Sequence, residues 1–92
     1  MPPIKILISA RDPSSAKSLK VVVKKMLEHP SLDLYVILQN PAFNIFSKNS
    51  KIKKNVKFIK KVLPTKSLEK KCLQFFNLIQ PDVVLTGISG PD

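Results

Sequence analysis

The chain has 92 residues, of which 43% are hydrophobic, and it carries a formal net charge of +10. This length and composition predict one small domain, while the single cysteine, Cys72, excludes an internal disulfide and the lone His29 has no neighbouring zinc ligands in sequence. No apolar run is long enough to span a bilayer, so we expect a soluble cytoplasmic protein with no metal and no cofactor.

The first predicted unit is a strand, a tight turn and a helix. Residues 4–8 form an almost continuous, branched apolar run, which is typical of a central strand in a parallel sheet. Asp12 as the helix cap and Pro13 at the first helical position predict a helix that runs to about Glu28. Its buried face is marked by apolar residues at three- and four-residue spacing: Ala16, Leu19, Val22, Val23, Met26 and Leu27.

The second unit repeats this pattern. Residues 32–38 predict another central strand, followed by Asn40 and Pro41 as a second cap and helix start. The apolar residues within 42–46 predict a helix of barely two turns, and the polar segment 47–55 predicts a loop.

The third unit opens on residues 56–60, where apolar and charged residues alternate, so we expect an edge strand. A helix capped by Thr65 or Ser67 follows. Its expected buried stripe consists of Leu68, Cys72, Phe75, Phe76 and Ile79.

Residues 82–87 predict a fourth strand, which reads as fully buried. Alternating strands and helices predict an α/β fold, a three-layer Rossmann-like half with a four-stranded parallel sheet in the order 3-2-1-4 and helices on both faces. The outer edge of strand 83–86 then lacks a cover. We therefore expect residues 1–92 to be a single domain from the amino-terminal part of a longer two-domain protein, or a homodimer paired at this edge.

The positive charge is concentrated between Lys48 and Lys71, where ten lysines face one acid, Glu69. Such a segment can attract phosphates, nucleic acid or an anionic membrane surface. It contains no arginine and no regularly interleaved aromatic residues, so nucleic acid is the less favoured of these partners. The alternative interpretation is an ordinary solvated lysine surface.

Ligands of open parallel sheets bind beyond the carboxyl ends of the strands, where the strand order reverses. In this chain that point brings two turns together, and neither matches a dinucleotide fingerprint or a P-loop. The catalytic residues are not identifiable from the pattern. The candidate ligand-binding residues are Arg11, Asp12, Ser14, Ser15, Gly87, Ser89, Gly90 and Asp92.

These candidates also have structural interpretations. Arg11 can simply be an exposed residue, Asp12 and the serines can only cap the helix, and the glycines can only permit a turn. His29 is interpreted as a helix-end residue and Cys72 as a core residue. Asp92 is either a functional acid or the cap of a further helix.

The segments 5–16 (KILISARDPSSA) and 81–87 (PDVVLTG) resemble the amino-terminal domain of GT-B glycosyltransferases and the related UDP-N-acetylglucosamine 2-epimerases. In that resemblance Arg11 matches the family arginine, Asp12 is inserted before the proline, and Ser14 replaces a glutamate. It implies a nucleotide-sugar or another phosphorylated small molecule as ligand, and a domain that forms the acceptor side of an interdomain cleft. It also implies that most nucleotide-sugar contacts come from a second domain, so this chain alone is expected to be catalytically silent. Because some members of such families are membrane-associated, the resemblance also implies that the lysines contact an anionic membrane surface.

Overall fold

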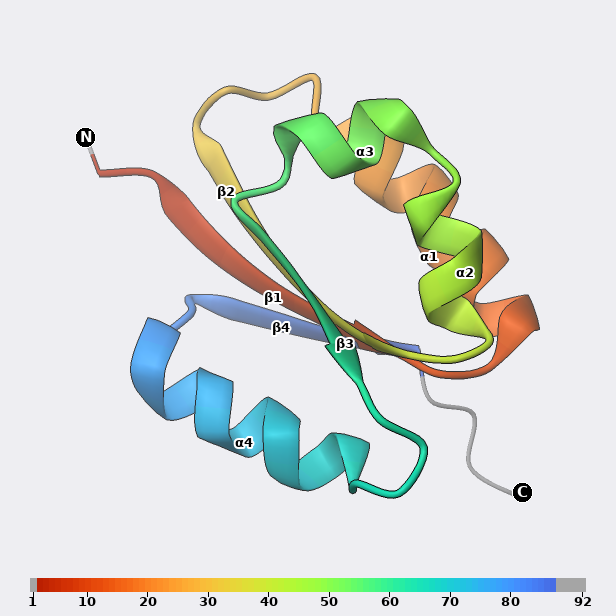
Figure 1. The fold of residues 1–92 in the computed structure, drawn as a ribbon. Coiled ribbons are helices and arrows are strands. Elements are labelled where there is room, and N and C mark those ends of the chain that lie inside the picture. Colours follow the sequence, from red (N-terminus) through yellow and green to blue (C-terminus); the bar gives the residue numbers. More distant parts are fainter. Residues whose placement is uncertain (1, 88–92) are drawn as a thin grey trace.

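The computed structural model describes residues 2–87, whose strands and helices are shown in Figure 1. In chain order they are β1 (Ile4–Ala10), α1 (Pro13–Met26), β2 (Leu32–Gln39), α2 (Ala42–Ser47), α3 (Ser50–Asn55), β3 (Phe58–Val62), α4 (Leu68–Ile79) and β4 (Val83–Gly87). No helix in this part of the chain has both the length and the apolar character needed to cross a lipid bilayer.

The four strands form one parallel sheet in the order β3-β2-β1-β4, as the sequence predicts. Ile8 lies in the centre of the sheet, opposite Val36 on one side and Leu85 on the other. Because all strands run in the same direction, their carboxyl ends lie along one side of the sheet. We call this side the carboxyl edge.

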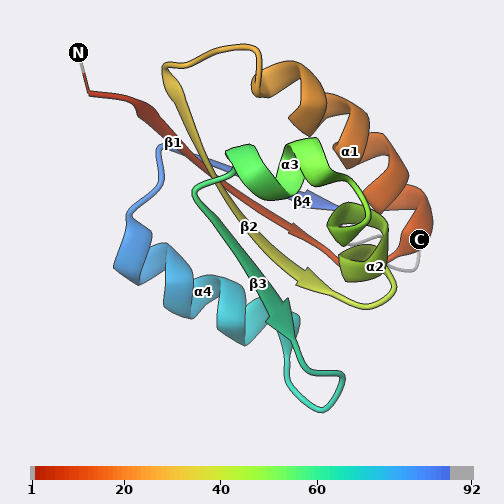
Figure 2. The same ribbon diagram turned by 45° about the horizontal axis from the view of Figure 1, so that its top comes forward.

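The sheet is the middle of three layers, with α1, α2 and α3 on one face and α4 on the other (Figures 1 and 2). Ile6 and Ile8 of β1 pack with the first group of helices, in a core that includes Phe46. Leu7 points to the opposite face and packs with Leu68 of α4. Burial on both faces explains why β1 is apolar almost throughout.

Helix α1 begins as predicted, with Asp12 in the N-cap position and Pro13 in the first turn, but the Asp12 side chain makes no capping hydrogen bond. The helix ends at Met26, two residues before the predicted end. The amides of Glu28 and His29 there bond to carbonyls only three residues back, which tightens the chain into a turn. The predicted buried face is correct except at Val22, which is 43% exposed.

The prediction of a loop over residues 47–55 is wrong, because residues 50–55 form α3. The Asn49 side chain accepts a hydrogen bond of 3.0 Å from the Ile52 amide, which caps the helix. Ile52 is fully buried against the core. A single apolar anchor in a lysine-rich segment is too weak a periodic signal to predict such a short helix.

Asn40 does not cap α2, contrary to the prediction. The N-cap position belongs to Pro41, which has no side-chain hydrogen bond, and the Asn40–Pro41 peptide bond is cis. The Ala42 amide instead donates to the carbonyl of Arg11 at 3.0 Å. The start of α2 is therefore tied to the turn after β1.

Strand β3 is an edge strand, as predicted, but it begins at Phe58, two residues later than expected. Val56 forms the C-cap of α3, and the Lys57 amide donates to the Leu34 carbonyl at 2.8 Å before the strand starts. Val56, which the alternation assigned to the strand, therefore ends the unexpected helix α3 instead.

Helix α4 is capped by Ser67, whose hydroxyl accepts from the Lys70 amide at 3.2 Å. Its buried stripe is as predicted except at Phe76, which is 41% exposed. Strand β4 is not fully buried, contrary to the prediction, since Val83 and Val84 are 43% and 38% exposed. It pairs only with β1, so its outer side has no neighbouring strand among the described residues.

Candidate functional site

The candidate site lies at the carboxyl edge, where the ends of β1 and β4 are adjacent. Ala10 is opposite Gly87, and Ser9 is opposite Thr86. From this point β2 and β3 extend the sheet to one side and β4 to the other. The structure therefore brings the first predicted turn next to the end of β4. The candidates Ser89, Gly90 and Asp92 lie outside the described residues.

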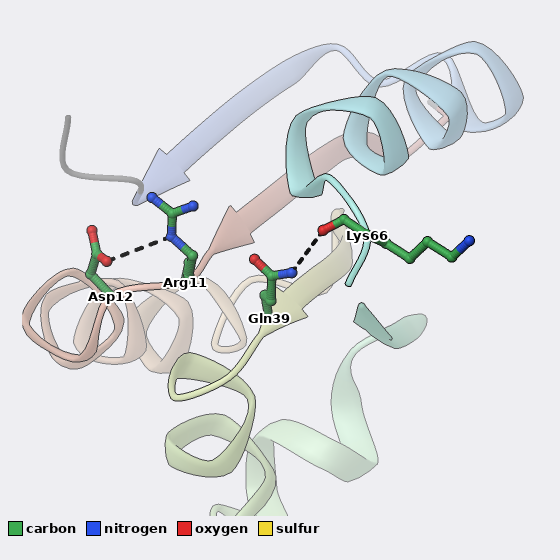
Figure 3. Close-up of polar contacts among 4 residues, drawn as sticks. All are labelled: Arg11, Asp12, Gln39 and Lys66. Atoms are coloured by element: carbon green, nitrogen blue, oxygen red, sulfur yellow. Dashed lines mark hydrogen bonds and ion pairs between the residues drawn. The ribbon is translucent and has the colours of Figure 1, made fainter. Parts of the chain in front are cut away.

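Arg11 directly follows β1, and its side chain is 42% exposed at the carboxyl edge (Figure 3). Its Nε atom lies 3.7 Å from Oδ1 of Asp12. Its carbonyl accepts the hydrogen bond from Ala42, so the backbone is anchored while the guanidinium faces the end of the sheet. An arginine held in this way can offer several N–H donors to an anion.

The other candidates of the first turn lie at the amino end of α1. Asp12 precedes the helix, Ser14 is exposed and Ser15 is half-buried. A helix amino terminus attracts anions, but the carboxylate of Asp12 adds a negative charge beside it. The local charge at this turn is thus a balance between Asp12 on one side and Arg11 and the helix end on the other.

Gly87 has a packing role that the structure makes explicit. A Cβ atom at this position would collide with Cδ1 of Leu19 and lie only 3.1 Å from Cβ of Ser15. Helix α1 can pack closely on the end of β4 because the residue there is glycine. This finding supports the structural interpretation of Gly87.

Gln39, at the end of β2, was not among the predicted site residues. The residue is 6% exposed, and its Nε2 donates to the carbonyl of Leu63 at 2.8 Å. The same atom donates to the carbonyl of Lys66 at 3.0 Å, as Figure 3 shows. It therefore holds the loop between β3 and α4 against the carboxyl edge. The signal in the sequence is a polar residue that directly follows the apolar run 34–38 of the strand.

The end of β3, this loop and the first turns of α4 carry a group of lysines that we call the lysine rim: Lys60, Lys61, Lys66, Lys70 and Lys71. Four of them, all except Lys70, line a hollow of about 110 Å³ together with Val62 and Leu63. Lys66, Lys70 and Lys71 also line a larger hollow of about 490 Å³ on the outer side of α4. Neither hollow is lined by a carboxylate.

The lysines between residues 48 and 71 do not all belong to this group. Lys51 in α3 lines a separate hollow with Lys24 and Lys25 of α1 and with Glu28, which follows that helix. Lys57 lies before β3, and its Nζ atom is 3.9 Å from Oδ1 of Asp33. The segment that is continuous in sequence is therefore divided over different parts of the surface.

Cys72 and His29 are the two residues that the sequence analysis interpreted as structural. Cys72 is half-buried and packs with the α4 core, and His29 is exposed beyond the end of α1. Among residues 2–87, no three His, Cys, Asp or Glu side chains gather closely enough to hold a metal ion.

Comparison with known proteins adds no relative. No protein-family model, no curated protein and no solved structure matches the chain. Its function has to be inferred from the chemistry of the carboxyl edge.

Proposed function

We propose that this domain binds the phosphate of a nucleotide-sugar, or of a related phosphorylated small molecule, at the end of β1 and β4. In this proposal it serves as the amino-terminal domain of a protein similar to GT-B glycosyltransferases or UDP-N-acetylglucosamine 2-epimerases. It supplies one wall of a cleft and has no turnover by itself. A second domain, or a second copy at the edge of β4, completes the sheet and the cleft.

The observation that carries this proposal is the position of Arg11. Its partly exposed guanidinium stands where the strand order reverses, beside the amino end of α1. Parallel α/β sheets bind ligands at this point because the loops after the strands diverge there and leave a crevice. A guanidinium next to a helix amino terminus attracts a phosphate through both charge and hydrogen bonds.

The ion pair between Arg11 and Asp12 does not prevent this binding. Its 3.7 Å separation and the partial exposure of both side chains make it a weak contact, since pairs that reach solvent contribute at most about 1 kcal/mol. A phosphate can therefore replace Asp12 as the partner of the guanidinium. The negative charge of Asp12 opposes the approach of an anion, so in this proposal Asp12 lowers the affinity for phosphate.

The test is a titration of the ¹⁵N-labelled chain with UDP-N-acetylglucosamine, UDP and N-acetylglucosamine, followed by amide shifts. We expect saturable shifts at residues 11–15 and Gly87 with both phosphorylated ligands, and none with the free sugar. Arg11→Gln should weaken binding by about tenfold or more, because a hydrogen bond to a charged group contributes about 1.5–3 kcal/mol. Asp12→Asn should strengthen it by removing the opposing charge.

Lys24→Gln is the matched control, because it removes the same charge from an exposed position on α1. If Arg11→Gln and Lys24→Gln weaken binding equally, only net charge matters and the proposal is wrong. The absence of saturable shifts near Arg11 would also contradict it.

A second candidate function is favoured by the lysine rim. Several lysines share one surface around the end of β3 without a carboxylate in the lining of either hollow. Such a surface suits the phosphate groups of an anionic membrane, and it lies on the β3 side of the sheet, across β2 and β1 from β4. This candidate predicts binding to vesicles with anionic lipids that weakens as the salt concentration rises.

A further inference from the structure

A hollow of about 240 Å³ lies between α4 and the ends of β1 and β4. It is lined by Ser9, Glu69, Cys72, Leu73, Phe76 and Thr86, and we call it the Ser9 hollow. Helix α4 packs mainly over β1 and β2 and leaves β4 uncovered on this face. Thr86 is exposed, and Leu73 and Phe76 are 63% and 41% exposed.

Ser9 is the unusual residue of this hollow. It has no exposed surface, and its hydroxyl has no hydrogen-bond partner among the described residues. It belongs to β1, whose other central residues are apolar. A buried hydroxyl without a partner carries an uncompensated desolvation cost, so native proteins rarely retain one without a reason. The orphaned Ser9 hydroxyl points to a ligand that supplies the missing hydrogen bond.

The lining of the Ser9 hollow restricts the chemistry of that ligand. Leu73 and Phe76 form an apolar wall, while the polar groups are the hydroxyls of Ser9 and Thr86, the Cys72 thiol and the Glu69 carboxylate. No lysine or arginine lines it, although the chain has 16 such residues. A phosphate would meet the carboxylate of Glu69 and no cation, so an anion is disfavoured here.

We propose that the Ser9 hollow binds a small uncharged molecule with one apolar ring and one hydroxyl group. The ring lies against Leu73 and Phe76, and the hydroxyl bonds to Oγ of Ser9. The space suffices, because a cavity of about 150 Å³ is large enough for benzene. Since Ser9 is fully buried, a side chain of the lining must move to admit the hydroxyl of the ligand. This site requires no phosphate and does not depend on the role proposed for Arg11.

The test uses benzyl alcohol and toluene as probes, which share the ring and differ in the hydroxyl. Amide shifts of the ¹⁵N-labelled chain should report saturable binding of benzyl alcohol at Ser9, Cys72, Phe76 and Thr86. Ser9→Ala should weaken the binding of benzyl alcohol about fivefold, which corresponds to the loss of one neutral hydrogen bond. Toluene should bind the parent and Ser9→Ala equally well, which shows that the hollow keeps its shape in the variant.

Two results would overturn this proposal. The first is that benzyl alcohol binds the Ser9→Ala variant as tightly as it binds the parent protein. The second is the absence of saturable amide shifts around the Ser9 hollow. Phe76→Ala gives a second check, because loss of the contact with the Phe76 ring should weaken the binding of both probes by a similar factor. Phe76 is partly exposed, so this variant should remain folded. A UDP titration at Arg11 remains interpretable whichever result is found.

Discussion

At the residue scale, the carboxyl edge contains side chains with different physical roles. Gly87 is explained by packing, because α1 approaches the end of β4 where a side chain would collide with Leu19. Gln39 is explained by the two carbonyls that its amide group binds. Arg11 and Ser9 are different, since the guanidinium of Arg11 is partly exposed and has only a loose ion pair with Asp12, and the hydroxyl of Ser9 has no hydrogen-bond partner among the described residues.

The packing role of Gly87 predicts that Gly87→Ala lowers the free energy of unfolding by about 1–2 kcal/mol, as overpacking usually does. The cost arises because Leu19 must rotate and the new Cβ crowds Ser15. Urea unfolding of the variant and the parent measures this difference. Leu19→Val removes the colliding Cδ1 atom, so Gly87→Ala should cost less in that background. Equal costs in both backgrounds would show that Leu19 is not the obstacle.

At the scale of elements, the helix caps show which helices begin at a local capping hydrogen bond and which helix depends mainly on tertiary packing. Asn49 and Ser67 each accept a bond from the amide three residues ahead, and these bonds set the starts of α3 and α4. Asp12 occupies the same position before α1 without such a bond. Helix α1 is longer and packs across the sheet, so its stability depends less on its cap.

Helix α3 is short, and we therefore expect Asn49→Ala to lower the free energy of unfolding by about 1 kcal/mol. The Ile52 amide would lose its acceptor, and the anchor of Ile52 in the core would loosen. Amide exchange at residues 52–55 should rise together with the fall in the urea midpoint. Asn49→Asp retains a capping oxygen and should stay close to the parent. An unchanged Asn49→Ala variant would mean that burial of Ile52 alone holds α3.

At the scale of the whole molecule, the two edges of the sheet differ in charge. Strand β3 carries Lys60 and Lys61, and charged edges discourage pairing with another strand. Strand β4 contains no charged residue and exposes Val83 and Val84. Cover of this edge by another domain or by a second copy stays a prediction.

The distribution of charge leads to a prediction for membranes. The chain should bind vesicles that contain phosphatidylserine and not neutral vesicles, and binding should weaken steeply between about 50 and about 200 mM salt. Simultaneous Lys66→Gln, Lys70→Gln and Lys71→Gln should weaken it about a hundredfold, since each lysine near an anionic surface contributes about 1 kcal/mol. Vesicle cosedimentation measures both effects.

The matched control is the combination Lys17→Gln, Lys24→Gln and Lys25→Gln, which removes the same charge from exposed positions of α1. It should bind almost as well as the parent. If both triple variants lose the same affinity, the lysine rim is not a specific contact surface.

The sequence by itself determined the central strands, the start of α1 and the strand order, and it narrowed the cap of α4 to Thr65 or Ser67. Continuous apolar runs, proline and serine at helix starts, and the alternation of elements are local signals that do not need the rest of the chain. It also placed Arg11 and Gly87 at the same end of the sheet, because the carboxyl ends of parallel strands lie together.

Only the tertiary structure decided α3, the start of β3, and the exposure of Phe76 and Val84. Each depends on what a segment packs against: Ile52 reaches the core from a polar segment, and α4 covers β1 and β2 rather than β4. The Ser9 hollow exists for the same reason, because α4 lies over β1 and β2 and not over the end of β4. A hydroxyl in an apolar strand is visible in the sequence, but whether it has a partner is decided by the elements that surround it.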